Sequence, residues 1–267
     1  MSISPHVLVA HPLDGAEAGE RVSLPEGTLH HLRRVLRLTD GAPLSLTDGR
    51  GVRADGTLDG DGALLAAAVT VAPLPRPRIV LAQALSKGRR AEDAVRVACE
   101  LGVDRIVPVV AARTQGRPDA RAAQTLVERW RGVAVSALEQ SRGVRLAEVD
   151  APVEGVTAVP AQADALRLIT EPGGAQLAGL LAGAQGPDGR TDARPEEVVV
   201  AVGPEGGWAP EELAAASAGG WLAVGLGPTV LRTEHAGPVA VAVVAALLGR
   251  WDTATLAARP SRSPDAL

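Results

Sequence analysis

The chain has 267 residues, of which 46% are hydrophobic, and a formal net charge of −4 at pH 7. A chain of this length folds as two domains or as one large domain, and this composition excludes an intrinsically disordered protein. The charge argues against broad non-specific binding to polyanions, but it is compatible with a local basic patch.

Residue types that common sites require are scarce. The single cysteine, Cys99, excludes an internal disulfide and a cysteine metal cluster, and its helical spacing from Ala94 and Ala98 favours a packing role. Among the histidines only His30 and His31 are close in sequence, so we expect no catalytic metal. The N-terminus lacks a signal-peptide pattern, and no apolar run is long enough to cross a membrane. We therefore expect a cytoplasmic protein.

Short strands broken by turns dominate residues 1–72. The turn signals separate four expected strands, at His6–Ala10, Pro43–Thr47, Gly51–Leu58 and Leu64–Val71. One helix is expected at Glu26–Leu36, with Leu36 facing the core while Arg33 and Arg37 share a solvated face. These features predict a small β-rich domain of barrel type.

Residues 73–77 form a stiff connector, because Pro73, Pro75 and Pro77 favour an extended chain. From residue 78 to 252 the pattern alternates between strands and helices, which predicts a parallel sheet with helices on both faces. The expected strands are Ile79–Leu85, Arg105–Val110, Ala165–Thr170, Val198–Val202 and Trp221–Gly225. The expected helices are Ala91–Leu101, Asp119–Glu139, Ala175–Leu181, Pro210–Ala218 and Glu234–Leu248. Residues 183–195 are expected to form a mobile loop, and residues 253–267 a flexible tail.

Two Gly/Pro-rich loops follow strands of the second domain. Gly203-Pro204-Glu205-Gly206-Gly207 follows one apolar run, and Leu226–Glu234 follows another. Ligands of open α/β sheets bind outside the carboxyl ends of the strands. Glycines let a backbone come close to a ligand, and prolines fix the loop shape. Two such loops, one with a glutamate and the other with Arg-Thr-Glu, predict a binding site.

The usual motifs of α/β enzymes are missing. Gly225-x-Gly227 has Val230 in place of the third glycine of a dinucleotide fingerprint. Lys87-Gly88 reverses the order of a phosphate-binding P-loop, and there is no G-x-S-x-G nucleophile elbow. Nucleotide-binding and hydrolytic enzymes are therefore disfavoured.

Basic stretches without acidic residues flank the connector. One stretch contains Arg33, Arg34 and Arg37, and the other contains Lys87, Arg89 and Arg90. Either stretch alone is readily explained as solvated charge. Together they indicate an electrostatic surface for a nucleic-acid backbone, which Arg142 would extend.

Five motifs in order resemble the RsmE family of SPOUT-superfamily methyltransferases, which methylate N3 of a uridine in bacterial 16S ribosomal RNA. They are Lys87-Gly88-Arg89, Ala98–Val103, Glu139–Arg142, the Gly203–Gly207 loop and the Leu226–Glu234 loop. His31-x-x-x-Val35-Leu36-Arg37 is similar to the PUA-like RNA-binding domain of that family.

The resemblance also implies a fold, a cofactor, an oligomeric state and a partner. It implies an α/β domain with a trefoil knot, S-adenosylmethionine as methyl donor without a metal, a homodimer, and the small ribosomal subunit as partner. The residues expected to bind the cofactor are Thr170, Glu171, Pro172, Gly203, Pro204, Glu205, Gly206, Gly207, Leu226, Gly227, Val230, Leu231 and Thr233.

Methylation of uridine N3 requires removal of its proton. We expect Arg232 to stabilise the resulting negative charge, and Glu205 or Glu234 to accept the proton or to orient the arginine. For Glu234 there is an equally good structural explanation, since an acidic residue at the start of a helix interacts favourably with the helix dipole.

Two alternatives share much of this pattern. Another SPOUT enzyme would use the same fold and cofactor on a different ribosomal or transfer RNA position. A non-catalytic RNA-binding assembly protein would have a degenerate pocket, against which the two intact loops argue.

Overall fold

The computed structural model describes residues 4–86, 89–183, 195–251 and 257–258. The expected mobile loop therefore lies almost entirely outside the described residues, as does most of the expected tail. The chain divides into two compact units. The first comprises Met1–Leu74, Leu138–Leu146 and Ala254–Leu267, and the second comprises Pro75–Ala137 and Ala147–Thr253.

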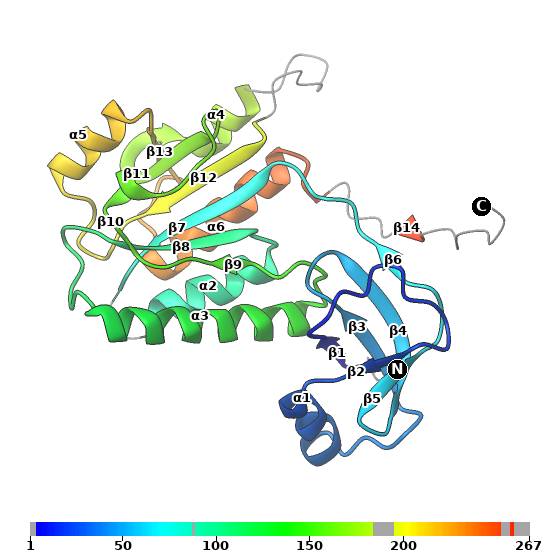
Figure 1. The fold of residues 1–267 in the computed structure, drawn as a ribbon. Coiled ribbons are helices and arrows are strands. Elements are labelled where there is room, and N and C mark those ends of the chain that lie inside the picture. The colour runs from blue at the N-terminus through cyan, green and yellow to red at the C-terminus, as the bar shows by residue number, and fades with distance from the viewer. Residues whose placement is uncertain (1–3, 87–88, 184–194, 252–256, 259–267) are drawn as a thin grey trace. The chain divides into compact units, whose positions relative to one another are not determined.

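The first unit is built on a mostly antiparallel sheet (Figure 1). Its strands are β1 (His6–Leu8), β2 (Arg21–Ser23), β3 (Pro43–Thr47), β4 (Val52–Asp59), β5 (Gly62–Leu65), β6 (Thr70–Val71) and β14 (Ala257–Ala258). The order is β1-β3-β4-β5-β2, with β6 beside β4 and β14 beside β6; only β1 and β3 pair in parallel. Alternate residues of β4 are buried, and together with Leu44, Leu46 and Leu65 they form an aliphatic core.

The expected helix of this unit is only partly correct. It begins at Glu26 as α1 (Glu26–His30) but continues as a π-helix, η1 (His31–Val35). Leu32 is buried, whereas Leu36 is 44% exposed. The prediction that Leu36 faces the core is wrong, because the wider turn of a π-helix changes the angular position of every residue after His31.

The segment Leu138–Leu146 is part of the first unit. His6 is buried, with Nδ1 3.0 Å from Ser45 Oγ and Nε2 2.8 Å from the Gly143 carbonyl oxygen. Leu8 N–H donates to Glu139 Oε1 at 3.1 Å. These bonds satisfy polar groups at the end of the unit's first strand, so the segment completes this sheet edge.

The second unit contains a parallel sheet in the order β10-β8-β7-β12-β11-β13, with β9 beside β8. Its strands are β7 (Arg78–Ala84), β8 (Arg105–Val110), β9 (Glu148–Val149), β10 (Val153–Glu154), β11 (Leu166–Gln176), β12 (Glu197–Val202) and β13 (Leu222–Gly225). Every pairing between these strands is parallel, which confirms the expected sheet type. The central strands are apolar and buried on both faces, as parallel strands covered by helices are.

Helices cover both faces of this sheet (Figure 1). They are α2 (Arg90–Glu100), α3 (Ala120–Ser141), η2 (Val156–Ala158), α4 (Leu177–Gly183), α5 (Pro210–Ala218) and α6 (Thr233–Leu247). On one face α6 packs against α2, β7 and β12. On the other, Ala216 of α5 and Val156 of η2 join a core cluster with Val80 and Val199. The prediction of helices on both faces is confirmed.

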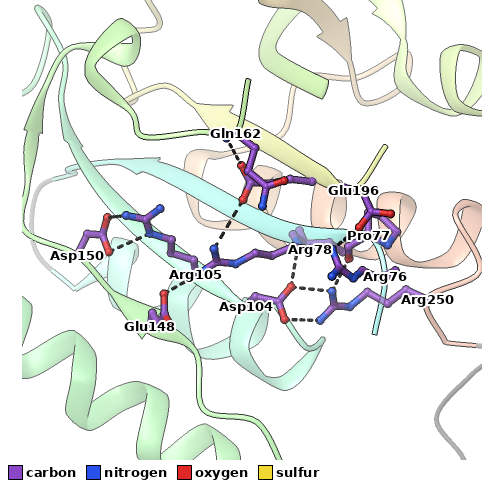
Figure 2. Close-up of polar contacts among 12 residues, drawn as sticks. Arg76, Pro77, Arg78, Asp104, Arg105, Glu148, Asp150, Gln162, Glu196 and Arg250 are labelled. Carbon is purple, nitrogen blue, oxygen red and sulfur yellow. Dashed lines mark hydrogen bonds and ion pairs between the residues drawn. The ribbon is translucent and has the colours of Figure 1, made fainter. Parts of the chain in front are cut away.

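Ion pairs and hydrogen bonds line the amino ends of these strands (Figure 2). Arg250, only 6% exposed, donates to Asp104 Oδ1 and Oδ2 at 2.9 and 2.6 Å and to the Pro77 carbonyl at 2.6 Å. Arg105 pairs with Asp150, and Arg78 with Glu148. This network fixes the end of the unit that lies opposite the Gly/Pro-rich loops.

Candidate functional site

A cavity lies at the carboxyl end of the sheet, where β11 and β13 run side by side. The pairing of β11 with β13 is interrupted between Thr170 and Ala175, so that both residues face Val224. The intervening residues leave the regular ladder. Gly174 is confined there, because a Cβ at this position would lie 2.7 Å from Val224 N. The bulge therefore depends on a glycine that lets two backbones approach closely.

This bulge and the loop after β13 enclose a cavity of about 150 Å³. Its lining residues are Thr170, Glu171, Pro172, Gly173, Val224, Gly225, Leu226, Gly227, Pro228, Thr229, Val230, Leu231 and Ala236. Gly173 and Gly227 have φ values of 88° and 134°, and a Cβ on either would project into open space. A wall made largely of Gly/Pro-rich backbone suits a ligand recognised through N–H and C=O groups.

The cavity brings together part of the set expected from the sequence. Thr170, Glu171, Pro172, Leu226, Gly227, Val230 and Leu231 all line it. It also includes Gly173, Gly225 and Ala236, which the sequence analysis did not identify. Gly173 lies just beyond Thr170, so the end of the expected strand was a signal that could have identified it. The bulge in β11 that brings Gly173 into the cavity wall has no sequence signal of its own.

The Gly203–Gly207 loop is not among the residues that line the cavity. Gly203 instead packs against the buried Trp208, since a Cβ there would lie 3.1 Å from the indole. Thr233 Oγ1 donates to the Gly203 carbonyl at 3.2 Å, which ties this loop to the first turn of α6. Arg113, another residue not identified from the sequence, donates to the Gly206 carbonyl at 2.8 Å.

The three expected catalytic residues occupy different environments. Arg232 is exposed at the N-cap of α6, and no hydrogen bond or ion pair joins its side chain to another described residue. Glu205 is exposed and pairs with Arg90 at 3.4 Å. Glu234 Oε2 is buried without a hydrogen-bond partner in the described chain. Glu234 precedes Gly237 by three positions, so both lie on the side of α6 that faces Gln83. Around the helix axis, Glu234 is about 160° away from Ala236, which lines the cavity.

Of the three expected RNA-binding arginines near η1, one has its side chain bonded within the unit and two do not. Arg33 pairs with Asp40 and donates to the Gly60 carbonyl at 2.8 Å. The hydrogen bond from Arg33 lowers the pKa of the Asp40 carboxyl below its usual range. The side chains of Arg34 and Arg37 are exposed and have no polar partner in the described part of the chain. Arg33 and Arg37 therefore differ, because Arg33 is half-buried and bonded whereas the Arg37 side chain is exposed.

The remaining basic candidates are dispersed. Lys87 lies outside the described residues. Arg89 pairs with the buried Glu92 at 3.3 Å, and Arg90 pairs with Glu205. Arg142, in the first unit, has a φ of 60° and donates to the Ser4 carbonyl at 2.7 Å. These bonds give Arg89 and Arg142 structural roles besides any contact with a ligand.

Neither the thiol nor the metal-ligating side chains of the described residues form a reactive site. Burial raises the pKa of the Cys99 thiol to about 12, so the nucleophilic thiolate is absent at neutral pH. No group of three or more His, Cys, Asp or Glu residues that could hold a metal ion is found where the chain is described. Among the described residues, no helix is long and apolar enough to span a membrane.

Two protein families match the chain. An RNA methyltransferase domain matches residues 72–245, and an RNA methyltransferase PUA domain matches residues 24–66. Relatives named ribosomal RNA small subunit methyltransferase E are similar over most of the chain. The one from Mycobacterium bovis is 37% identical over 226 residues, covering 83% of this chain and 85% of its own. The one from Synechocystis is 34% identical, covering 85% and 73%.

Solved structures agree with the sequence relatives. Ribosomal RNA small subunit methyltransferase E from Neisseria gonorrhoeae, bound to S-adenosylmethionine, is 27% identical, with a TM-score of 0.75 over 92% of this chain and 98% of its own. A methyltransferase from Legionella pneumophila, also solved with this cofactor, gives the same values.

Proposed function

The chain belongs to the ribosomal RNA small subunit methyltransferase E family, and we propose that it transfers a methyl group from S-adenosylmethionine to N3 of a uridine in 16S ribosomal RNA. The membership confirms the resemblance seen in the motifs, and with it the α/β fold and the PUA-type first domain. The single observation that carries the proposal is the glycine-lined cavity at the carboxyl ends of β11 and β13, because it offers this family's cofactor a wall of backbone groups.

The residues present fit this cofactor. Open space faces Gly173 and Gly227, so a ligand can approach the backbone where any side chain would obstruct it. Bound there, the cofactor would supply an electrophilic methyl group on a sulfonium. The remaining task of the chain is to hold the uracil in line with that methyl group and to manage its N3 proton.

Arg232 is the residue that we propose stabilises the uracil anion. It is exposed and unpaired among the described residues, and Leu231 beside it lines the cavity. Of the two carboxylates, Glu205 is better suited to accept the proton, because it is 38% exposed and its partner Arg90 is also exposed. Glu234 lies on the side of α6 turned toward the buried Gln83, which favours a structural role.

The proposal has three further parts that follow from the family. The C-terminal segment of the second unit would pass through a loop to form a trefoil knot. The active unit would be a homodimer, with the small ribosomal subunit as its partner. Because the substrate would be ribosomal RNA, the protein would act in the cytoplasm.

Calorimetry with S-adenosylmethionine tests the cavity. Gly227→Val should abolish binding, because a β-branched side chain is strained at a φ of 134° and adds bulk to a residue that lines the cavity. Gly116→Val, at a φ of 72° in a loop outside the cavity, is the matched control for backbone strain. Equal cofactor affinity in Gly227→Val and wild type would remove this cavity from the proposal.

The reaction is tested by incubating the protein and cofactor with 16S ribosomal RNA from a strain lacking this methylation, and then analysing the nucleosides by mass spectrometry. We expect 3-methyluridine. Methylation of another nucleoside, or of transfer RNA only, would identify a different RNA specificity. Cofactor binding without methyl transfer to any of these RNAs would favour the assembly-protein alternative.

A further inference from the structure

The end of η1 exposes apolar side chains that the proposed function leaves unexplained. Val35 is 60% exposed and Leu36 is 44% exposed, although neighbouring Leu32 is buried. Single exposed apolar residues are common on protein surfaces. Here two adjacent ones lie between Arg34 and Arg37, which are also exposed. We call these four residues the η1 tip.

The backbone holds the η1 tip in an unusual conformation. Leu36 N–H donates to the His31 carbonyl at 3.0 Å, the five-residue bond of a π-helix, and Arg37 follows with a φ of 56°. Short π-helices occur frequently at functional sites, and a positive φ on a residue other than glycine costs free energy. Leu38 N–H then donates to the Leu32 carbonyl at 2.9 Å, which closes the turn. This geometry keeps Val35 and Leu36 out of the core.

The charged side chains along the sequence of the η1 tip are all basic. No acidic residue occurs from Gly27 to Thr39, and the nearest one in sequence after it, Asp40, is held by Arg33. Arg34 and Arg37 have no polar partner among the described residues, so their guanidinium groups are available to an anionic ligand. Arg33 is excluded from this role because it is bonded to the turn between β4 and β5 through the Gly60 carbonyl.

We propose that the η1 tip binds an unpaired nucleotide of RNA, with the base against Val35 and Leu36 and the flanking phosphates on Arg34 and Arg37. This rests on the proposed function and names the contact that its RNA would make. Every base has an apolar face, and unpaired bases are the ones a protein can cover. The chain has no Phe or Tyr, so aliphatic side chains framed by arginines take the place of an aromatic platform.

A second copy of the chain fits this surface less well. Two side chains cannot approach the roughly 1,200 Å² that a specific protein interface buries. The unpaired side chains of Arg34 and Arg37 also favour a negatively charged partner, which the phosphates of RNA provide.

The test compares the double variant Val35→Ser/Leu36→Ser with Leu64→Ser/Leu74→Ser. Leu64 and Leu74 are apolar residues of the same unit with similar exposures of 40% and 58%, so they are matched controls. The probes are a synthetic RNA hairpin with an unpaired loop and a duplex of the same stem without the loop. Binding is measured by fluorescence anisotropy over a salt series, and thermal unfolding checks that each variant is folded.

We expect the Val35/Leu36 variant to bind the hairpin on the order of 10-fold more weakly, with an unchanged salt dependence, because the substitutions remove the apolar cover of a base and leave both arginines in place. Affinity for the duplex, and both affinities of the control, should match wild type. Arg34→Ala/Arg37→Ala should instead reduce the slope of log affinity against log salt by about 0.7 for each phosphate that is no longer neutralised.

Equal hairpin affinity in the Val35/Leu36 variant and wild type would overturn the proposal. Conversion of a dimer to a monomer in sedimentation, with RNA affinity unchanged, would make the η1 tip an interface between copies. These assays need no methyl transfer. A wild-type protein that binds the hairpin through the η1 tip but methylates no RNA would therefore count against the proposed function alone.

Discussion

At the scale of single residues, the decisive candidate is Arg232. Its side chain is exposed at the start of α6, and Glu205, which could have been its partner, pairs with Arg90 instead. Arg232→Ala should therefore lower the methylation rate by about 10²–10³, the usual effect of losing one preorganised donor at a developing charge. Cofactor affinity should stay near wild type. Single-turnover methylation at saturating RNA and cofactor measures the rate.

Arg232→Lys is the control for geometry. An ammonium keeps the charge but cannot reproduce the planar fork of a guanidinium, so only part of the rate should return. If Arg232→Ala instead turned over at a near-normal rate, the residue would be structural. A joint loss of thermal stability and cofactor binding would lead to the same conclusion.

The stability of the protein should depend on pH through His6 of the first unit. Burial lowers the pKa of His6 from 6.5, against the opposing effect of its hydrogen bond to the Gly143 carbonyl. Above pH 6.5 the side chain is neutral in both the folded and the unfolded state. Below it the unfolded chain binds the proton first, so the free energy of unfolding should fall as pH falls, by up to about 1.4 kcal/mol per pH unit for one group.

Urea unfolding between pH 5 and 8 measures this dependence. His6→Gln keeps a polar side chain without a titrating group and should flatten the pH dependence. His11→Gln, at an exposed histidine of the same unit, is the matched control. The same pH slope in His6→Gln as in wild type would assign the dependence to other groups.

At the scale of elements, the regular strands and helices of the second unit could be predicted from apolar runs and their spacing. The strand at Arg105–Val110 and the helix at Pro210–Ala218 have the expected bounds. The missed strands β2, β9, β10 and β14 have two or three residues each, too few to show a period. Leu64–Val71 was expected as one strand, but the structure divides it into β5 and β6.

The π-helix was not predictable, because its sequence has ordinary helical spacing. Leu29, Leu32 and Leu36 fit one face of an α-helix, and only the hydrogen bond from Leu36 to His31 reveals the wider turn. The error changed which residues face solvent. It placed Leu36 in the core, whereas Leu36 is 44% exposed. It also left Arg33 free in solvent, whereas Arg33 is half-buried and bonded to the Gly60 carbonyl.

Helix α6 packs so closely on β7 that a glycine is required in its first half. A Cβ on Gly237 would lie 2.8 Å from Gln83 Oε1 and 3.3 Å from both Leu81 methyl carbons. Gln83 is fully buried, so moving its side chain would disturb the packing around it. Gly237→Ala should therefore destabilise the protein by about 1–3 kcal/mol through overpacking, despite the better helix propensity of alanine.

Gly132→Ala provides the matched control in another helix. Gly132 is exposed in α3, and a Cβ there would meet nothing within 4 Å. Alanine should stabilise the protein by about 0.5–1 kcal/mol at such a site. Urea unfolding of both variants measures whether each substitution raises or lowers the free energy of unfolding. Stabilisation by Gly237→Ala would mean that β7 and α6 separate at little cost.

At the scale of the whole molecule, the position of the cavity could be predicted from the sequence, but not which loops line it. Strand ends in a parallel sheet gather at one edge, so loops after strands were expected to meet there. The cavity joins the loop after β13 to the β11 bulge, but the Gly203–Gly207 loop packs on Trp208 and Thr233 instead. That difference depends on contacts between residues about 5 to 60 positions apart, which no local pattern contains.

The oligomeric state is the last expectation to test. Along α6, Val239, Ala242, Val243 and Leu247 are only half-buried within the chain and recur at helical spacing. An apolar stripe of this kind favours cover from a second subunit, and a two-fold dimer is the commonest way to provide it. Sedimentation velocity at concentrations where the enzyme turns over should give a species of twice the 27.2 kDa chain mass.

A variant identifies the surface that holds the dimer together. Val243→Asp puts a charge in the middle of the stripe and should produce a folded monomer, because an unpaired carboxylate in an apolar interface is strongly unfavourable. Val97→Asp, on an apolar residue of α2 that is 39% exposed, is the control for adding a charge to a neighbouring helix. A wild-type protein that sediments as a monomer while methylating RNA would contradict the dimer. A dimer that survives Val243→Asp would place the interface away from this stripe.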